Sequence, residues 1–134
     1  MSDELGKIPD LLNQDGKLAV VDQGESCTIV AELKLGDDAQ TSVSTLKLTL
    51  YNETTNAVIN SRNAQNVNGA NGGSIDADGI LTMNLDAADN PIVDSTLGVG
   101  DLENHVARFT WTWTGGRTGI QELRFRVRKL ATPT

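Results

Sequence analysis

Alternation of apolar and polar residues with a period of two is the feature that most constrains how this chain can fold. Residues 45–51 place Leu46, Leu48 and Leu50 on one side, and residues 105–113 repeat the pattern with larger side chains. Successive side chains of a β-strand point to opposite faces, so this period predicts strands with one buried and one solvent-facing side. The chain is therefore predicted to be all-β.

Turn signals divide the pattern into about seven or eight short strands. The expected strands are residues 17–22, 26–35, 45–51, 57–59, 80–85, 105–113 and 120–130. Asp78-Gly79 is a strong turn dipeptide, and residues 61–74, rich in Asn, Gly and Ala, are predicted to form a long surface loop. One-sided antiparallel strands of this number favour two sheets packed face to face as an immunoglobulin-like β-sandwich.

The 134 residues suit one domain. We expect an N-terminal arm over residues 1–16, the sandwich domain over 17–130 and a C-terminal tail over 131–134. The arm holds a small apolar cluster interrupted by Pro9, and such arms often fold against a neighbouring molecule. It does not resemble a secretion signal, and no apolar run is long enough to span a membrane.

The formal net charge of −7 opposes binding to nucleic acid phosphates. The charge is uneven, because residues 124–134 carry +4 and the rest carry −11. The last strand should present a basic stripe on its outer face. The candidate partner-binding residues are Arg124, Arg126, Arg128, Lys129 and, in the preceding hairpin, Arg117. The stripe would dock an acidic surface, or else be a solvated face that discourages edge pairing.

Residues that could carry chemistry are few. Cys27 is the single cysteine, so no intramolecular disulfide can form, which fits a reducing cytoplasm. Its place on an apolar face predicts a small buried side chain. His105, the single histidine, is predicted to be a partly buried, hydrogen-bonded structural residue. Residues 76–79 resemble the opening of a calcium loop but lack its later ligands. No catalytic, metal or cofactor site is predicted, and the chain is not expected to be an enzyme.

Three alternating aromatic residues, Phe109, Trp111 and Trp113, are predicted to form the centre of the core. Trp113, nearest the hairpin, should be the most exposed of them. An alternative places Trp113 beside the 61–74 loop in a site that grips sugars.

Residues 44–128 resemble small phage proteins with an immunoglobulin-like fold. The resemblance lies in STLKLTLYNETTNAVINSR, DADGILTMNLDAADNPIVD and HVARFTWTWTGGRTGIQELRFRVR. Such modules serve as capsid decoration proteins, tail-tube ornaments and adaptors of receptor-binding proteins. The resemblance implies a symmetric oligomer, frequently a trimer.

The expected function is that of a non-enzymatic structural protein of a phage virion, made in the host cytoplasm. We expect it to decorate, or cement, the outer surface of the head. The partner would be the major capsid protein or a tail protein, with no nucleic acid, membrane or cofactor involved. The alternatives are a tail- or neck-associated structural protein and a module that binds carbohydrate or the host surface.

Overall fold

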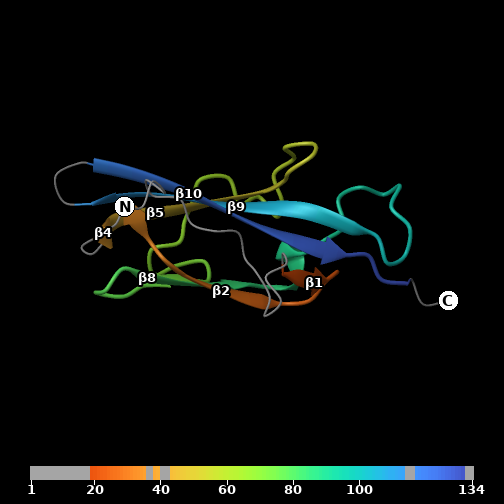
Figure 1. Ribbon diagram of the computed structural model, residues 1–134, viewed down its shortest axis with the longest axis horizontal. Helices are drawn as coiled ribbons and strands as arrows, with labels where there is room; N and C mark the ends of the chain where they lie inside the picture. Colours follow the sequence, from red (N-terminus) through yellow and green to blue (C-terminus); the bar gives the residue numbers. More distant parts are fainter. Residues whose placement is uncertain (1–18, 36–37, 40–42, 114–116, 132–134) are drawn as a thin grey trace.

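The computed structural model describes residues 19–35, 38–39, 43–113 and 117–131, which build two β-sheets in two layers (Figure 1). The all-β prediction is confirmed, and the two layers are compatible with a β-sandwich. The predicted arm over residues 1–16 lies outside the described residues, as does most of the predicted tail.

The first sheet has five strands in the order β1-β10-β9-β5-β6. Their bounds are β1 Val20–Asp22, β10 Arg117–Arg128, β9 Leu102–Trp113, β5 Val43–Asn52 and β6 Gln65–Asn66. The long β9–β10 hairpin forms the middle of this sheet. All its neighbouring strands run antiparallel except β1, which pairs with β10 in parallel.

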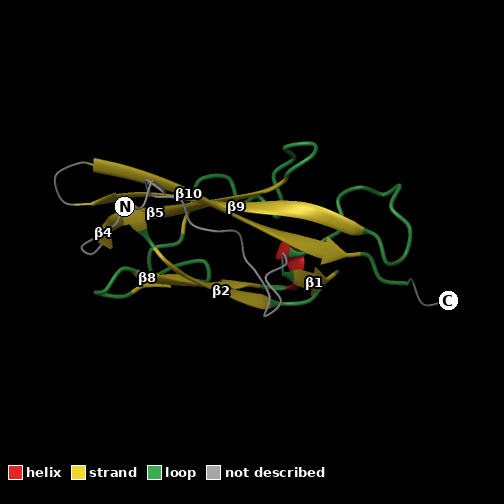
Figure 2. Ribbon diagram, in the orientation of Figure 1, coloured by secondary structure: helices red, strands yellow, loops and turns green. Residues whose placement is uncertain are grey.

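The second sheet has the order β2-β8-β7 and is antiparallel. Its strands are β2 Cys27–Glu32, β8 Ile80–Leu85 and β7 Gly73–Ile75. A two-residue pair, β3 Lys34–Leu35 and β4 Asp38–Ala39, stands apart from both sheets. One 3₁₀ turn, η1 Ala87–Asp89, follows β8 (Figure 2).

The inner faces of both sheets share one hydrophobic core. Its fully buried side chains include Leu46, Leu48 and Leu50 of β5, Leu81, Met83 and Leu85 of β8, Phe109 and Trp111 of β9, and Leu123, Phe125 and Val127 of β10. These are the positions that the period of two placed inward, so that prediction is confirmed. Trp113 is half-buried, which makes it the most exposed of the three aromatic residues, as predicted.

Three expected elements differ from the structure. The strand predicted over residues 57–59 is reduced to one isolated bridge between Val58 and Tyr51. The strand predicted over residues 26–35 is interrupted at Leu33, whose backbone N–H donates to Gly79 O across the turn before β8. The 61–74 loop is more ordered than predicted, because it contains β6 and the start of β7. Its polar residues pair with the β5 backbone, which a search for apolar periods cannot detect. The structure also contains short strands that the sequence did not predict, so the described residues form ten strands in all.

Candidate functional site

A buried ion pair joins the two sheets along one side of the sandwich, here called the open side, where β6 and β7 are the edge strands. Arg62, just before β6, donates from Nε to Asp89 Oδ1 at 2.5 Å and from Nη2 to Asp89 Oδ2 at 2.9 Å. Asn60 Nδ2 adds a third hydrogen bond to Asp89 Oδ1 at 2.8 Å. Asp89 belongs to η1, which follows the second sheet, so these contacts tie the edge of one layer to the other.

The charges of this pair are well compensated. Asp89 is fully buried and Arg62 is 6% exposed. Burial by itself would raise the pKa of the Asp89 carboxyl. The hydrogen bonds from Arg62, Asn60 and the backbone N–H of Asp86 outweigh it, and the pKa lies below its ordinary value. Asp89 is therefore ionised at neutral pH.

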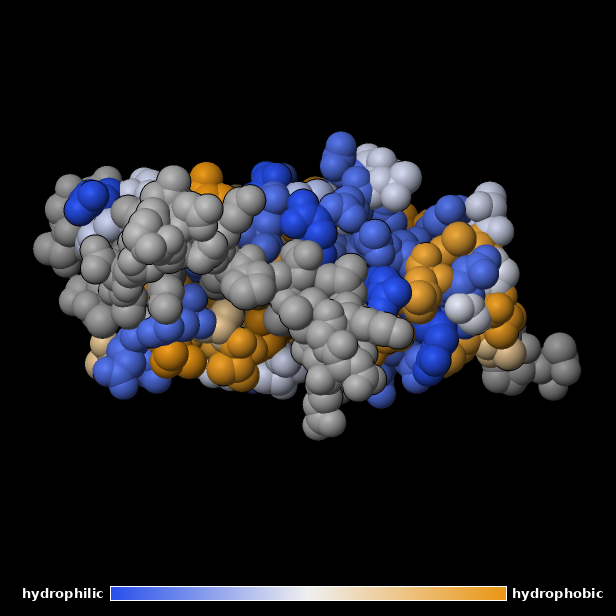
Figure 3. Space-filling model, in the orientation of Figure 1, coloured by the Kyte–Doolittle hydropathy of each residue, from blue (hydrophilic) through white to orange (hydrophobic). Residues whose placement is uncertain are grey.

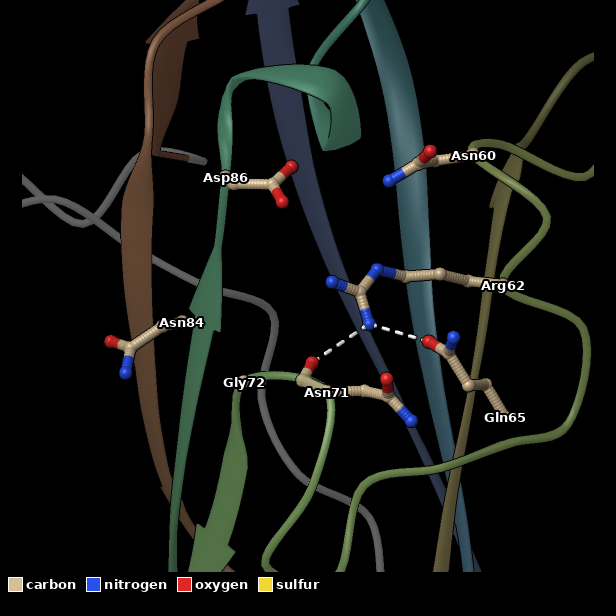
Figure 4. A pocket seen from close by; sticks show the side chains of 7 residues that line it. All are labelled: Asn60, Arg62, Gln65, Asn71, Gly72, Asn84 and Asp86. Atoms are coloured by element: carbon tan, nitrogen blue, oxygen red, sulfur yellow. Dashed lines mark hydrogen bonds between the residues drawn. The ribbon is translucent and has the colours of Figure 1, made fainter.

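Beside this pair lies a cavity of about 460 Å³, here named the polar pocket (Figure 4). Its lining residues are Asn60, Arg62, Gln65, Asn71, Gly72, Asn84 and Asp86. Arg62 Nη1 donates to Gln65 Oε1 at 2.6 Å and to the backbone carbonyl of Asn71 at 3.0 Å. One wall comes from the edge of the first sheet and the opposite wall from the end of β8.

A second buried cluster holds the loop over residues 91–101. Glu103 accepts hydrogen bonds from the backbone N–H groups of Val93 and Asp94, and its Oε2 contacts His105 Nε2. Burial lowers the pKa of the His105 imidazole in spite of the neighbouring carboxylate. The pKa of Glu103 lies below its ordinary value, because the hydrogen bonds from His105 and the loop outweigh the effect of burial. His105 is hydrogen-bonded, as predicted, and is fully rather than partly buried.

Exposed apolar side chains occur on the loop, at the start of β9 and after β10, segments that meet at one end of the molecule; apolar surface also appears elsewhere on the face drawn in Figure 3. We name Val93, Val99, Leu102 and Leu130 the apolar end; their exposed fractions run from 36% for Val93 to 66% for Val99. The loop and the chain after β10 are joined there by backbone hydrogen bonds, for example from the N–H of Gly100 to the carbonyl of Lys129.

The predicted basic stripe is spread along β10, and its charges contact groups of this chain. Arg124 Nε lies 2.5 Å from Glu53, and Arg128 Nη2 lies 2.6 Å from Asp22 of β1. Arg126 is half-buried on the same strand, opposite Val20 of β1 in the pairing register.

The two flanking cations of the stripe lie far apart along β10. Lys129 Nζ donates to the carbonyl of Leu97, beside the apolar end. Arg117 stands at the other end of β10, with its guanidinium 5.5 Å from the centre of the Trp113 ring. The five candidates therefore do not form one patch.

The sugar site suggested by the sequence does not assemble as expected. Residues of the 61–74 loop line the polar pocket, but Trp113 is not among its lining residues. Sequence reasoning also missed the partners that this pocket takes from outside the loop, Asn60, Asn84 and Asp86. The positive φ of Asn60 and Asn71, a conformation that Asn adopts more readily than most residues, belongs to the same region.

The aspartates that suggested a calcium loop serve local backbone structure. The Asp76 carboxylate accepts from the N–H groups of Asp78 and Ile80, and Asp86 caps η1. Among the described residues, no group of three or more His, Cys, Asp or Glu side chains could hold a metal ion. Cys27 is half-buried rather than buried, and burial raises the pKa of its thiol.

Comparison with known proteins identifies no relative: no protein-family model matches the chain, and no curated protein matches it. Within the part of the chain that the structure describes, no helix has the length and apolar character required to cross a membrane.

Proposed function

We propose that this chain is a non-enzymatic structural protein of a phage particle, and that it decorates the outer surface of the head by binding the major capsid protein. The apolar end carries this proposal. Exposed apolar side chains on segments that meet at one end of a small protein are candidates for contact with a partner. Val99 and Leu102, at 66% and 41% exposed, would be buried by such a contact.

The apolar end is held in a defined shape before any partner arrives. The Glu103 carboxylate accepts from Val93 and Asp94 near the start of the loop, and backbone hydrogen bonds join its far end to the chain around Lys129. A surface that is already ordered loses little conformational entropy on binding, which favours the complex.

One predicted cation, Lys129, lies beside the apolar end. It adjoins Leu130, and its ammonium group donates to the carbonyl of Leu97, a neutral group, whereas Arg128 is already paired with Asp22. A partner with an acidic rim around an apolar centre would match this surface, the usual division of a protein interface. Arg124 and Arg117 lie elsewhere on β10 and are not part of the proposed contact.

The sandwich itself is proposed to be immunoglobulin-like. In that fold the first sheet contains strands C, F and G and the second contains B, E and D. The strands β5, β9 and β10 correspond to C, F and G. The strands β2, β8 and β7 correspond to B, E and D, in the same order across the sheet. The two-residue β6 occupies the position of the extra strand C′ that variable-type domains add beside C.

The test uses a matched pair of surface variants. Val99→Glu introduces a charge into the apolar end, whereas Val30→Glu makes the same change at a valine that is 63% exposed on β2. Purified protein is mixed with phage heads stripped of it, and binding is measured by co-sedimentation. Val99→Glu should abolish binding and Val30→Glu should retain it. Equal binding by both variants would show that the apolar end is not the contact surface.

The alternative proposal is that the same surface binds a protein of the tail or neck instead of the head. Immunogold electron microscopy of intact particles separates the positions, because head decoration labels the whole shell and a tail role labels the tail or neck alone. Light scattering of the purified protein tests the proposed symmetric oligomer, a trimer in its simplest form.

A further inference from the structure

The side chains around the polar pocket are each anchored by one polar atom. Gln65 Oε1 accepts from Arg62, Asn60 Nδ2 donates to Asp89, and Asp86 Oδ1 caps η1. Gln65 Nε2 and Asn60 Oδ1 make no hydrogen bond with the described residues. The Asp86 carboxylate also accepts from the backbone N–H of Asp89 in the capping box, and Asp86 remains exposed. The pocket thus offers an amide donor, an amide acceptor and an exposed carboxylate on side chains that are already anchored, with much of the rotamer entropy already lost.

The charges of the pocket favour a neutral ligand. The Arg62 guanidinium is already neutralised by its bidentate contact with Asp89, and the accessible charge on the facing wall is the carboxylate of Asp86. That carboxylate repels an anion. A single carboxylate among the described lining residues supplies too few ligands for a divalent metal ion. The side chains of Asn60, Arg62, Gln65 and Asp86 converge on the same space in Figure 4, whereas Asn84 points away from it.

We propose that the polar pocket binds a neutral polyhydroxylated molecule, in particular one sugar unit of a glycan. A hydroxyl group both donates and accepts, so neighbouring hydroxyls can match the carboxylate and the amide atoms together. The volume of about 460 Å³ lies in the range of small-molecule sites. No aromatic side chain lines the pocket, so binding rests on hydrogen bonds, with a Kd of about 1 mM expected for a single sugar.

This proposal is independent of where the protein sits on a particle. The pocket lies on the open side of the sandwich, and none of its lining residues belongs to the apolar end. Loss of capsid binding would leave the pocket intact, and loss of sugar binding would leave the apolar end intact.

The test follows the side-chain amide signals by NMR while glucose, galactose, mannose or N-acetylglucosamine is added in turn. With at least one sugar, the amide signals of Gln65 and Asn60 should shift and saturate. Sodium phosphate and calcium chloride are the ionic arms of the experiment and should leave both signals in place. Failure of all four sugars, or saturable shifts with either salt instead, would overturn the proposal.

Two variants keep the fold and change the pocket. Gln65→Glu retains the oxygen that accepts from Arg62 but turns the donor Nε2 into an acceptor. Asp86→Asn retains the cap of η1, since Asn caps as well as Asp, and removes the charge. Each should weaken sugar binding about three- to tenfold, the effect of one hydrogen bond. Asn63→Asp is the charge-matched control outside the lining and should bind as the parent protein does; equal affinity in all the variants would contradict the proposal.

Discussion

Replacing Arg62 by alanine tests the view that the ion pair with Asp89 holds the two sheets together along their open side. The variant removes both hydrogen bonds to Asp89 and those to Gln65 and Asn71. It leaves the Asp89 carboxylate fully buried, with only Asn60 and a backbone N–H as partners. The free energy of unfolding should therefore fall sharply.

The expected loss is about 3–5 kcal/mol at pH 7, the usual effect of leaving one member of a buried ion pair uncompensated. A domain of this kind has a total stability of about 5–15 kcal/mol, so the variant would lie close to unfolding. The exposed pair of Arg128 and Asp22 supplies the control, because both side chains are more than a third exposed. Arg128→Ala should cost about 1 kcal/mol or less.

Urea unfolding followed by tryptophan fluorescence measures both variants. The dependence on pH distinguishes a buried charge from lost packing. In Arg62→Ala, burial favours the neutral form of Asp89, so its pKa rises above the unfolded value. The penalty is then present at neutral pH and is relieved as the pH falls through that raised pKa. A loss below about 1 kcal/mol, or one that does not shrink between about pH 7 and about pH 4, would refute the reasoning.

Three further variants test other parts of the fold. Gly119→Ala would set a Cβ 2.3 Å from a ring atom of Trp111, so the melting temperature should fall, with a loss of about 1–3 kcal/mol; an unchanged melting temperature would contradict this packing. Burial lowers the pKa of His105, so its contribution to stability is full above the unfolded value of 6.5 and is lost as the pH falls. His105→Gln, which keeps a donor for Glu103, should reduce the decline in unfolding free energy between about pH 7.5 and about pH 5.5, and an equally steep decline would rule out His105 as its source. Asp76→Ala removes the acceptor of two backbone N–H groups in the turn before β8, and chemical denaturation should show a loss of about 1–2 kcal/mol, whereas a neutral result would mean that the turn does not depend on that carboxylate.

The core could be predicted because its signal is local. A buried strand such as β5 places leucine at every second residue, and Leu46, Leu48 and Leu50 are all fully buried. The same period of two puts His105 on the inner face of β9, where it is fully buried. It did not give the parallel pairing of β1 with β10, because the alternation within a strand carries no information about which strand lies beside it.

The polar pocket could not be predicted, because its residues carry no period. Arg62 lies in a stretch that reads as a polar loop, and its partner Asp89 is 27 residues away. Each residue alone is typical of a solvated surface, and only the crossing between the sheets brings them together. The positive φ of several Asn residues gives the region its shape, and Asn is also common in ordinary turns.

The basic stripe shows how an acidic chain can use its few cations. A stripe facing solvent would attract any acidic surface, including other copies of this protein. Arg124 and Arg128 instead contact Glu53 and Asp22, and Arg108 of β9 contacts Glu122. These contacts link β10 to β1, to β9 and to the residue after β5 across the outer face of the first sheet, and they reduce its local charge. Binding specificity is then expected at surfaces whose groups are not already engaged, which are the apolar end for a protein and the polar pocket for a sugar.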